Sequence, residues 1–183
     1  MNYLYFIIFI LITIIFLLLY VIYKKSESQW SRQTKHRLKI LEHSLGDPRY
    51  TVPSKEGYAV WKHVNKNISE VILYNEGLIN KTPIEHVNMI TVGMKLSVNI
   101  DNLFSILSLS KIIWYNQLTS ILYVRSSSLL ICLETLKYIK NYITNSQQTQ
   151  TIDSIFIDNY EMEYKNPELY FSKVKELLNE LGK

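Results

Sequence analysis

Residues that cross-link or loosen a chain are scarce in this sequence, which has one cysteine, Cys132, four prolines and five glycines among 183 residues. A single cysteine cannot form an internal disulfide, so the fold does not depend on oxidation. With so little glycine and proline, long disordered linkers are not expected. Subtracting the first 25 residues, most of which form one apolar run, leaves 158, which suits one compact domain.

Local motifs of catalysis and cofactor binding are also missing. The four histidines, His36, His43, His63 and His86, form no H-x-x-x-H pair, and the chain has no phosphate loop, G-x-G-x-x-G or G-x-S-x-G. Cys132 falls on the apolar stripe of an expected helix, where cysteine usually packs as a small hydrophobe. We therefore predict no catalytic, cofactor-binding or metal-binding residues. A catalytic site assembled from residues distant in sequence stays open, because it needs no local motif.

Positive charge is concentrated in one short stretch of the chain. Residues 24–40 hold six Lys and Arg against Glu27, a sum of +5, whereas residues 150–183 hold seven acids against four lysines, a sum of −3. The net charge of +4 is therefore a property of one segment and not of the whole domain. A nucleic-acid-binding domain is expected to carry a basic face, so we predict no nucleic-acid partner.

The longest apolar run covers residues 3–23, which contain no charge, glycine or proline. A helix of that length would span roughly 30 Å, the thickness of the hydrocarbon core of a bilayer. Tyrosines stand near both ends, as in an interfacial aromatic belt, and Lys24 and Lys25 follow at once. No small-x-small cleavage site follows the run. These features predict an uncleaved transmembrane anchor over residues 1–25.

The charges beside the anchor also predict its orientation. All six nearby Lys and Arg lie on the C-terminal side, and such an excess is typical of the cytoplasmic side of a span. We therefore expect a single-pass membrane protein of signal-anchor type. Its N-terminus would lie outside and its C-terminal domain in the cytoplasm.

Residues 26–46 are expected to form a basic juxtamembrane segment with an amphipathic helix over 28–45. Thr34, Leu38, Leu41 and Leu45 fall on one helical stripe, and Gly46 is placed to cap the end. The basic side is either a solvated face of a packed helix or a surface that contacts anionic lipid headgroups. The residues assigned to that membrane-surface contact are Lys24, Lys25, Trp30, Arg32, Lys35, Arg37 and Lys39.

The remaining chain predicts a small, helix-rich α+β domain with a short hairpin or small sheet. Three local signals are clear: the Thr82-Pro83-x-Glu85 capping box, two β-rich runs separated by five residues, and an Asn166-Pro167 helix start. Residues 47–146 would form the domain, with residues 147–183 packed on it. The expected helices are 55–66, 82–96, 102–109, 129–143 and 167–181, and the expected strands are 71–74, 112–115, 121–124 and 152–157.

Two functions fit these features. The first is a membrane-anchored adaptor or structural protein that presents a small domain for contact with a protein partner at a membrane surface. The abundance of Ile, Asn, Lys and Tyr is typical of AT-rich genomes, including large DNA viruses, which suggests a virion component. The second is a membrane-tethered enzyme that acts on a lipid or a membrane-bound substrate. A histidine within hydrogen-bonding distance of Cys132 or of an acid would favour the enzyme.

Overall fold

The computed structural model describes residues 2–27, 30–54, 56–75, 90–96, 106–107, 112–144 and 166–183. Their helices are α1 (Asn2–Glu27), α2 (Arg32–Leu45), α5 (Leu129–Thr144) and α8 (Pro167–Gly182), and their strands are β1 (Tyr50–Val52), β2 (Tyr58–Lys62), β3 (Ile68–Tyr74), β4 (Ile90–Lys95), β5 (Ile113–Asn116) and β6 (Ile121–Ser126). The strands form one sheet in the order β1-β2-β3-β4-β6-β5, and all neighbours are antiparallel. The class is α+β, but a six-stranded sheet replaces the short hairpin or small sheet that the sequence predicted.

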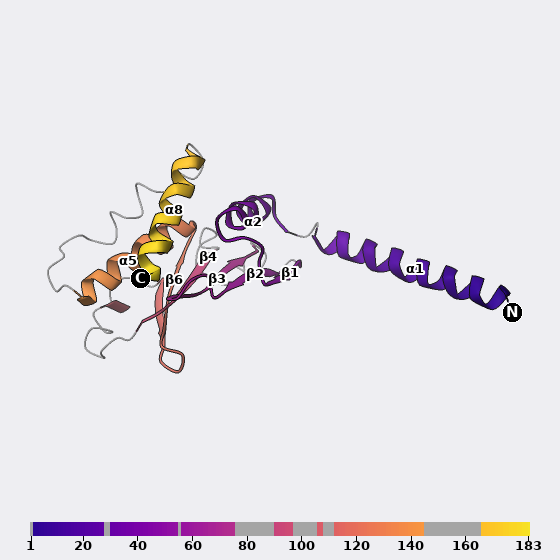
Figure 1. The fold of residues 1–183 in the computed structure, drawn as a ribbon, viewed down its shortest axis with the longest axis horizontal. Helices are drawn as coiled ribbons and strands as arrows, with labels where there is room; N and C mark the ends of the chain where they lie inside the picture. The colour runs from indigo at the N-terminus through magenta and orange to yellow at the C-terminus, as the bar shows by residue number, and fades with distance from the viewer. Residues whose placement is uncertain are drawn as a thin grey trace.

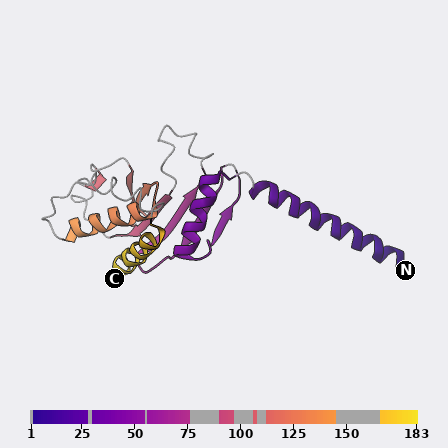
Figure 2. The same ribbon diagram turned by 90° about the horizontal axis from the view of Figure 1, so that it is seen from above.

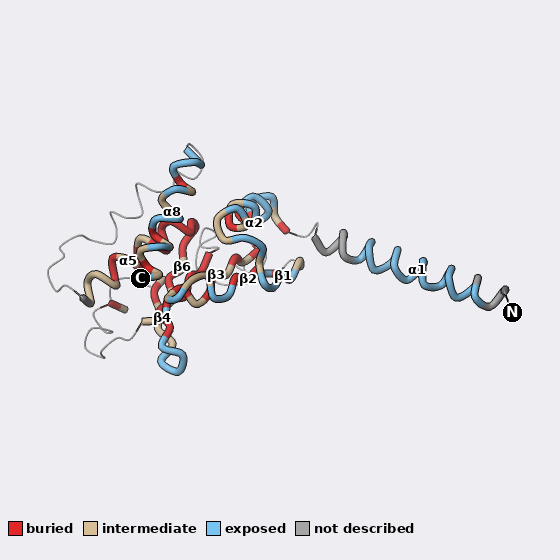
Figure 3. Tube along the Cα trace, in the orientation of Figure 1, coloured by how far each residue is buried: buried red, intermediate tan, exposed pale blue. Residues whose placement is uncertain are grey.

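Three helices lie on one face of this sheet (Figures 1 and 2). α5 packs on β4 and β6, while α2 and α8 pack on β3, and α8 also contacts α5 and α2. Alternate strand residues point into this layer and are buried, as Val71 and Leu73 of β3 are. Figure 3 shows the buried residues gathered between the sheet and the helices. The core therefore lies on one side of the sheet, as expected for an antiparallel sheet with one solvated face.

Several local signals of the sequence are confirmed, whereas the capping box at Thr82 lies outside the described residues. β5 and β6 form the expected hairpin, and β3 contains the expected strand over 71–74. α5 covers the predicted helix over 129–143, and α8 begins at Pro167 with the Asn166 side chain accepting a hydrogen bond from the Leu169 amide. Helix α2 ends at Gly46, whose φ of 77° lies in the left-handed region that glycine adopts without strain. In each case the ends are determined by nearby residues.

Two predicted helices are wrong. Residues 58–62, inside the expected helix 55–66, form β2, whose Trp61 donates from Nε1 to the Gly46 carbonyl at 2.7 Å. Residues 90–95, the second half of the expected helix 82–96, form β4 in the middle of the sheet. Pairing with neighbouring strands overrides weak local helix signals in both stretches. Residues 76–89 and most of 102–109, and the expected strand 152–157, lie outside the described residues.

The predicted membrane anchor is contradicted. Figure 1 shows α1 extending away from the sheet, but no helix among the described residues is both long and apolar enough to cross a membrane. The single-pass signal-anchor topology, the outside N-terminus with a cytoplasmic domain, and the virion membrane assignment are therefore wrong.

The turn between β2 and β3 is fastened to the end of α8 by two asparagines. Asn65 donates from Nδ2 to the Leu178 carbonyl at 2.7 Å, and Asn67 donates to the Leu181 carbonyl at 2.6 Å. The Asn65 Oδ1 also accepts from the amides of Asn67 and Ile68. The bond from Asn67 satisfies the Leu181 carbonyl, which lies in the last turn of α8 and has no amide one turn further along the helix.

We expect Asn65→Ala to lower the free energy of unfolding by about 1–2 kcal/mol, because it removes one inter-element bond and two turn bonds from a partly buried site. Urea denaturation of the full chain measures this loss. Lys66→Ala, at an exposed position in the same turn, is the control and should change stability by no more than about 0.5 kcal/mol. Equal effects of the two substitutions would mean that the asparagine bonds contribute nothing.

Candidate functional site

The face of the sheet opposite the helices carries an unusual set of side chains. Strand alternation turns Glu70 and Tyr74 of β3, Tyr123 and Arg125 of β6, and Trp114 of β5 away from the helical layer. Among the described residues, α2, α5 and α8 all pack on the other face. This open face therefore presents aromatic rings and charged groups side by side.

Arg125 is the centre of this surface. Its guanidinium carbon lies 5.2 Å from the ring centroid of Tyr74 and 5.2 Å from that of Trp114. Its Nε donates to the Thr91 Oγ1 at 3.1 Å. The Trp114 and Tyr123 rings are stacked, with centroids 5.2 Å apart and planes inclined by 9°. We call Tyr74, Thr91, Trp114, Tyr123 and Arg125 the Arg125 cluster.

The register of the strands explains why these side chains meet. Trp114 is directly opposite Tyr123 in the β5–β6 pair, and Arg125 is opposite Thr91 in the β4–β6 pair. Gly93 is opposite Tyr123 on β4, and a Cβ at Gly93 would lie 2.7 Å from the Tyr123 Cε1. Glycine is therefore required at this position so that the tyrosine ring can lie flat over the backbone of β4.

Glu70 links the Arg125 cluster to the next strands. Its carboxylate accepts from the Tyr123 hydroxyl at 2.7 Å and forms an ion pair with Lys62 on β2. Burial raises the pKa of the Tyr123 hydroxyl, and the hydrogen bond to Glu70 and its negative charge act in the same direction. Tyr123 therefore remains protonated at physiological pH and acts as a hydrogen-bond donor, which holds its ring in place.

Beside Glu70 the open face is hollowed at the edge of the sheet. A hollow of about 590 Å³ lies over β1, β2 and β3, with walls that include Arg49, Tyr50, Val60, Lys62 and Ile72. Its rim is the edge strand β1, whose three residues are all exposed. Glu70 lines the hollow and accepts a hydrogen bond from Tyr123 of the Arg125 cluster, so the hollow and the cluster adjoin on the same face of the sheet.

The structure does not bring the seven residues of the predicted membrane-surface contact together. Trp30 and Arg37 are buried, with 5% and 4% of their surfaces exposed, and face the core side of α2. Arg32, Lys35 and Lys39 are exposed on the other side of that helix. The side chains of Lys24 and Lys25 lie outside the described residues. A contact between the exposed basic side of α2 and anionic lipid stays a prediction.

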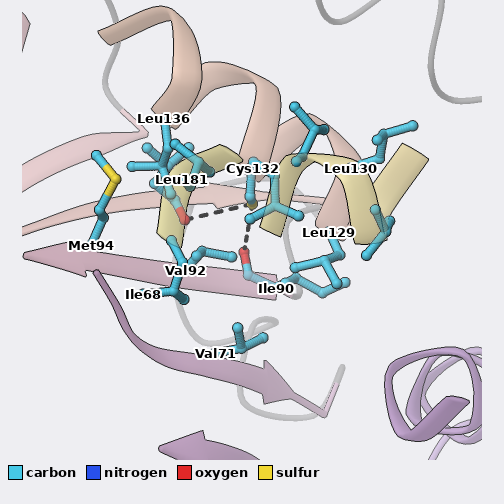
Figure 4. Close-up of a cluster of buried hydrophobic side chains, with 14 of the residues drawn as sticks. Ile68, Val71, Ile90, Val92, Met94, Leu129, Leu130, Cys132, Leu136 and Leu181 are labelled. Atoms are coloured by element: carbon cyan, nitrogen blue, oxygen red, sulfur yellow. Dashed lines mark hydrogen bonds between the residues drawn. The ribbon is translucent and has the colours of Figure 1, made fainter. Parts of the chain in front are cut away.

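The structure places Cys132 in the core, as the sequence predicted. Its side chain is fully buried against the sheet, and its Sγ lies 3.7 Å from the Ile90 carbonyl and 3.6 Å from the Val124 carbonyl (Figure 4). Burial raises the pKa of the thiol, against smaller lowering effects from the Ser126 backbone and the Arg125 charge. The group is therefore a protonated thiol without access to substrate, which is typical of a structural cysteine.

Histidines offer no catalytic pair with that thiol in the described part of the chain. His63 is exposed in the turn between β2 and β3 with a φ of 55°, and His86 lies outside the described residues. No three His, Cys, Asp or Glu side chains gather to form a metal site among the residues that the structure describes. The described residues therefore give no support to a catalytic or metal-binding role for these histidines and Cys132.

Sequence reasoning missed the open face, although part of its signal was present. Trp114 and Tyr123 lie in the two strands of the predicted hairpin, and Tyr123 and Arg125 are two residues apart and so share a face. The contributions of Glu70, Tyr74 and Thr91 depend on strand pairings that no local pattern reveals. Comparisons of this chain with family models, with curated proteins and with solved structures found no match.

Proposed function

We propose that the protein is a protein-binding module whose contact surface is the open face of the sheet. The Arg125 cluster carries this proposal, because it gathers two tyrosines, one tryptophan and one arginine on the face against which none of the described helices packs. Tryptophan, tyrosine and arginine are enriched in protein interfaces and dominate their binding energy. The proposal keeps the expectation of a protein partner without the membrane anchor.

The rigidity of the cluster supports a binding role. Arg125 is held by two rings and by Thr91, and Tyr123 is held by Trp114 and Glu70. Side chains fixed before binding lose little conformational entropy when a partner docks, which favours affinity. Thr91 is buried, but the other four side chains of the cluster are only partly buried, so their outer surfaces remain available.

The charge of the open face indicates an acidic partner. Among the residues that the structure describes, the strands and the hollow place Arg49, Lys62, Lys95 and Arg125 on this face, against the carboxylate of Glu70. Four cations against one carboxylate leave an excess of positive charge, which attracts and orients an acidic protein surface. A guanidinium flanked by aromatic rings also suits bidentate pairing with a carboxylate.

Single-stranded nucleic acid is the main alternative partner for an aromatic, basic sheet face. Bases bind such platforms by stacking on free ring faces. Here Trp114 is already stacked on Tyr123, and Arg125 lies near the centroids of Trp114 and Tyr74. The rings are thus engaged within the protein, which favours a protein partner.

The enzyme hypothesis finds less support than the binding module. It requires a nucleophile or paired titratable groups that converge in a cleft. Cys132 is buried and protonated, and the Glu70 carboxylate is already paired with Lys62 and Tyr123. The described residues therefore offer this hypothesis no reactive pair.

Photo-crosslinking from the open face tests the proposed function. A benzophenone amino acid at Ile72, on the hollow, should form a discrete adduct with an acidic protein in the source cell. The same group at Lys175, exposed on α8, is the matched control and should not form it. Trp114→Ala should weaken binding of the captured partner at least about 30-fold, as expected for an interface hot spot.

Two results would contradict this function. Adducts formed equally from Ile72 and Lys175 would mean that the open face has no special role. An adduct with RNA or DNA, abolished by Trp114→Ala, would instead identify the open face as a nucleic-acid-binding surface.

A further inference from the structure

The edge of the sheet at β1 offers backbone groups as well as side chains. In the described part of the chain β1 pairs with β2 alone, so its other side has backbone amides and carbonyls but no neighbouring strand. All three residues of β1 are exposed. An edge of this kind is a template to which an extended segment of another chain can add as a further strand.

Exposed apolar side chains are concentrated at this edge. Outside α1, five large apolar side chains are exposed among the described residues, and three of them lie on β1 and β2. They are Tyr50, which is 52% exposed, and Val52 and Tyr58, which are each 39% exposed. All three line the hollow beside Glu70. Exposed apolar residues that stand singly are ordinary on a protein surface, but a group that adjoins one hollow is typical of an interaction site.

The strand register joins this edge to the Arg125 cluster. Directly opposite residues of neighbouring strands point to the same face of a sheet. Two rows of such residues lead from β1 to the cluster: the first comprises Tyr50, Val60, Ile72, Thr91 and Arg125, and the second comprises Val52, Tyr58 and Tyr74. A strand added to β1 would therefore place every second side chain on the open face, beside Tyr50 and Val52.

The residues around β1 limit the length of such a strand. Pro48 and Pro53 flank β1, and proline has no amide to donate to a neighbouring strand. The Ser54 amide also donates to the Val52 carbonyl at 2.9 Å, where the chain turns away from the edge. The stretch open to pairing is therefore short, about four residues over positions 49–52.

Charge favours an acidic segment over a second copy of this chain at the edge. Arg49 is exposed directly before β1, and its guanidinium carbon lies 5.5 Å from the centroid of the Tyr50 ring. Arg49 lines the hollow together with Lys62. Two copies joined through their β1 edges would bring two basic surfaces side by side, which is unfavourable. A segment that carries carboxylates would instead pair with Arg49.

We propose that β1 binds a short, extended, acidic segment of the protein partner, which pairs with the strand through backbone hydrogen bonds. Alternate apolar side chains of the segment contact Tyr50, Val52 and Tyr58 at the hollow, and a carboxylate pairs with Arg49. This inference rests on the proposed protein-binding function and adds the way in which the partner is held.

Peptides with methylated amides test the strand pairing on the full chain. The probe is the fluorescein-labelled peptide Glu-Val-Thr-Val-Thr-Val-Glu, and fluorescence anisotropy measures its affinity. In an added strand the amides of alternate residues point toward β1 and the others point away. Methylating either the valine amides or the threonine amides should therefore lower the affinity at least about tenfold, and methylating the other set should have a much smaller effect. Equal effects of the two methylations, or no binding of the unmethylated peptide at millimolar concentration, would overturn the proposal.

A matched pair of variants tests where the peptide binds. Val52→Glu places a carboxylate at the edge and removes an apolar contact, so affinity for the acidic peptide should fall at least about tenfold. Leu118→Glu makes the same kind of change at a side chain that is 98% exposed between β5 and β6, and it should leave the affinity unchanged. Because both positions are exposed, both variants should unfold at the urea concentration of the original chain. Equal affinities of the two variants would place the binding away from β1 and refute the proposal.

Arg49→Gln tests the pairing with a carboxylate. It should weaken binding of the acidic peptide several-fold but leave unchanged the binding of a peptide with glutamine at both ends. If Arg49→Gln binds both peptides as tightly as the original chain does, the segment need not be acidic and the proposal fails. Crosslinks from Ile72 judge the proposed function separately. An acidic protein captured there, together with peptide binding that ignores amide methylation, would refute strand addition alone.

Discussion

Replacing Asn75 by alanine is expected to lower the free energy of unfolding by about 3 kcal/mol. Asn75 is 1% exposed at the end of β3. Its Oδ1 accepts from the Ser31 amide at 3.2 Å and from the Thr34 hydroxyl at 2.9 Å, and its Nδ2 donates to the Ser54 carbonyl at 3.0 Å. One side chain therefore joins the start of α2, the end of β3 and the chain between β1 and β2.

The size of this effect follows from what alanine leaves behind. The Thr34 hydroxyl is fully buried, and it would retain only its contact with Ser31. Each buried polar group that loses its partner costs roughly 1–3 kcal/mol, more than the net value of the hydrogen bond itself. Urea denaturation followed by circular dichroism measures the total. A loss below about 1 kcal/mol would show that water replaces the missing amide.

Asn75→Asp and Thr34→Val separate the contribution of the hydrogen bonds that the Asn75 Oδ1 accepts from that of the bond that its Nδ2 donates. Aspartate keeps the acceptor toward Ser31 and Thr34 but places negative charge against the Ser54 carbonyl, so it should also destabilise the protein. Thr34→Val removes the hydroxyl, so Asn75→Ala should cost less in that background. A double-mutant cycle with no coupling would contradict the hydrogen bond between the two side chains.

Elements with local signals were predictable from the sequence. The hairpin of β5 and β6 is two β-rich runs with a short connection, and α8 begins with an asparagine cap and a proline. The end of α2 at Gly46 likewise needs only the conformational freedom of glycine. In all three cases a few neighbouring residues determine the geometry.

β2 and β4 were not predictable in this way because their conformations depend on partners. Five of the six residues of β4 are buried, since both its neighbours and Tyr123 cover it, so the hydrophobic alternation that identifies a strand is absent. β2 was mistaken for a helix although Tyr58, Val60 and Trp61 favour strands. Its register with β3 and the hydrogen bond from Trp61 to Gly46 depend on tertiary contacts that the local sequence does not reveal.

The candidate functional residues likewise divide into those that local sequence places and those that only tertiary contacts place. Arg37 was counted with the basic side of α2 because it is charged, yet it follows the buried Thr34 by three residues and so lies near the helix face that packs on the core. On the open face, Glu70 and Tyr123 are 53 positions apart in the chain and meet only because β3 and β6 both pair with β4. No pattern within one segment could have revealed that contact.

Gly93→Ala is expected to lower the free energy of unfolding by about 2–3 kcal/mol and to disorganise the Arg125 cluster. The added Cβ would lie 2.7 Å from the Tyr123 Cε1 and 3.0 Å from the Ile121 Cγ2. β4 is paired on both sides, so its backbone cannot move away and the tyrosine ring must shift. That shift would lengthen the hydrogen bond to Glu70 and separate the ring from Trp114.

A double-mutant cycle distinguishes this collision from a general effect of alanine in a strand. With Tyr123→Ala in place, the closest contact over Gly93 is removed and only the Ile121 Cγ2, at 3.0 Å, remains close to the added Cβ. The further change Gly93→Ala should therefore cost much less than it does beside the tyrosine ring. Urea denaturation of the four proteins gives the coupling free energy, expected at about 2 kcal/mol. Partner binding should fall in Gly93→Ala as it does in Trp114→Ala, since both disturb the same rings. If Gly93→Ala destabilises the protein equally with and without the Tyr123 ring, the close approach of that ring to β4 is not what requires glycine at position 93.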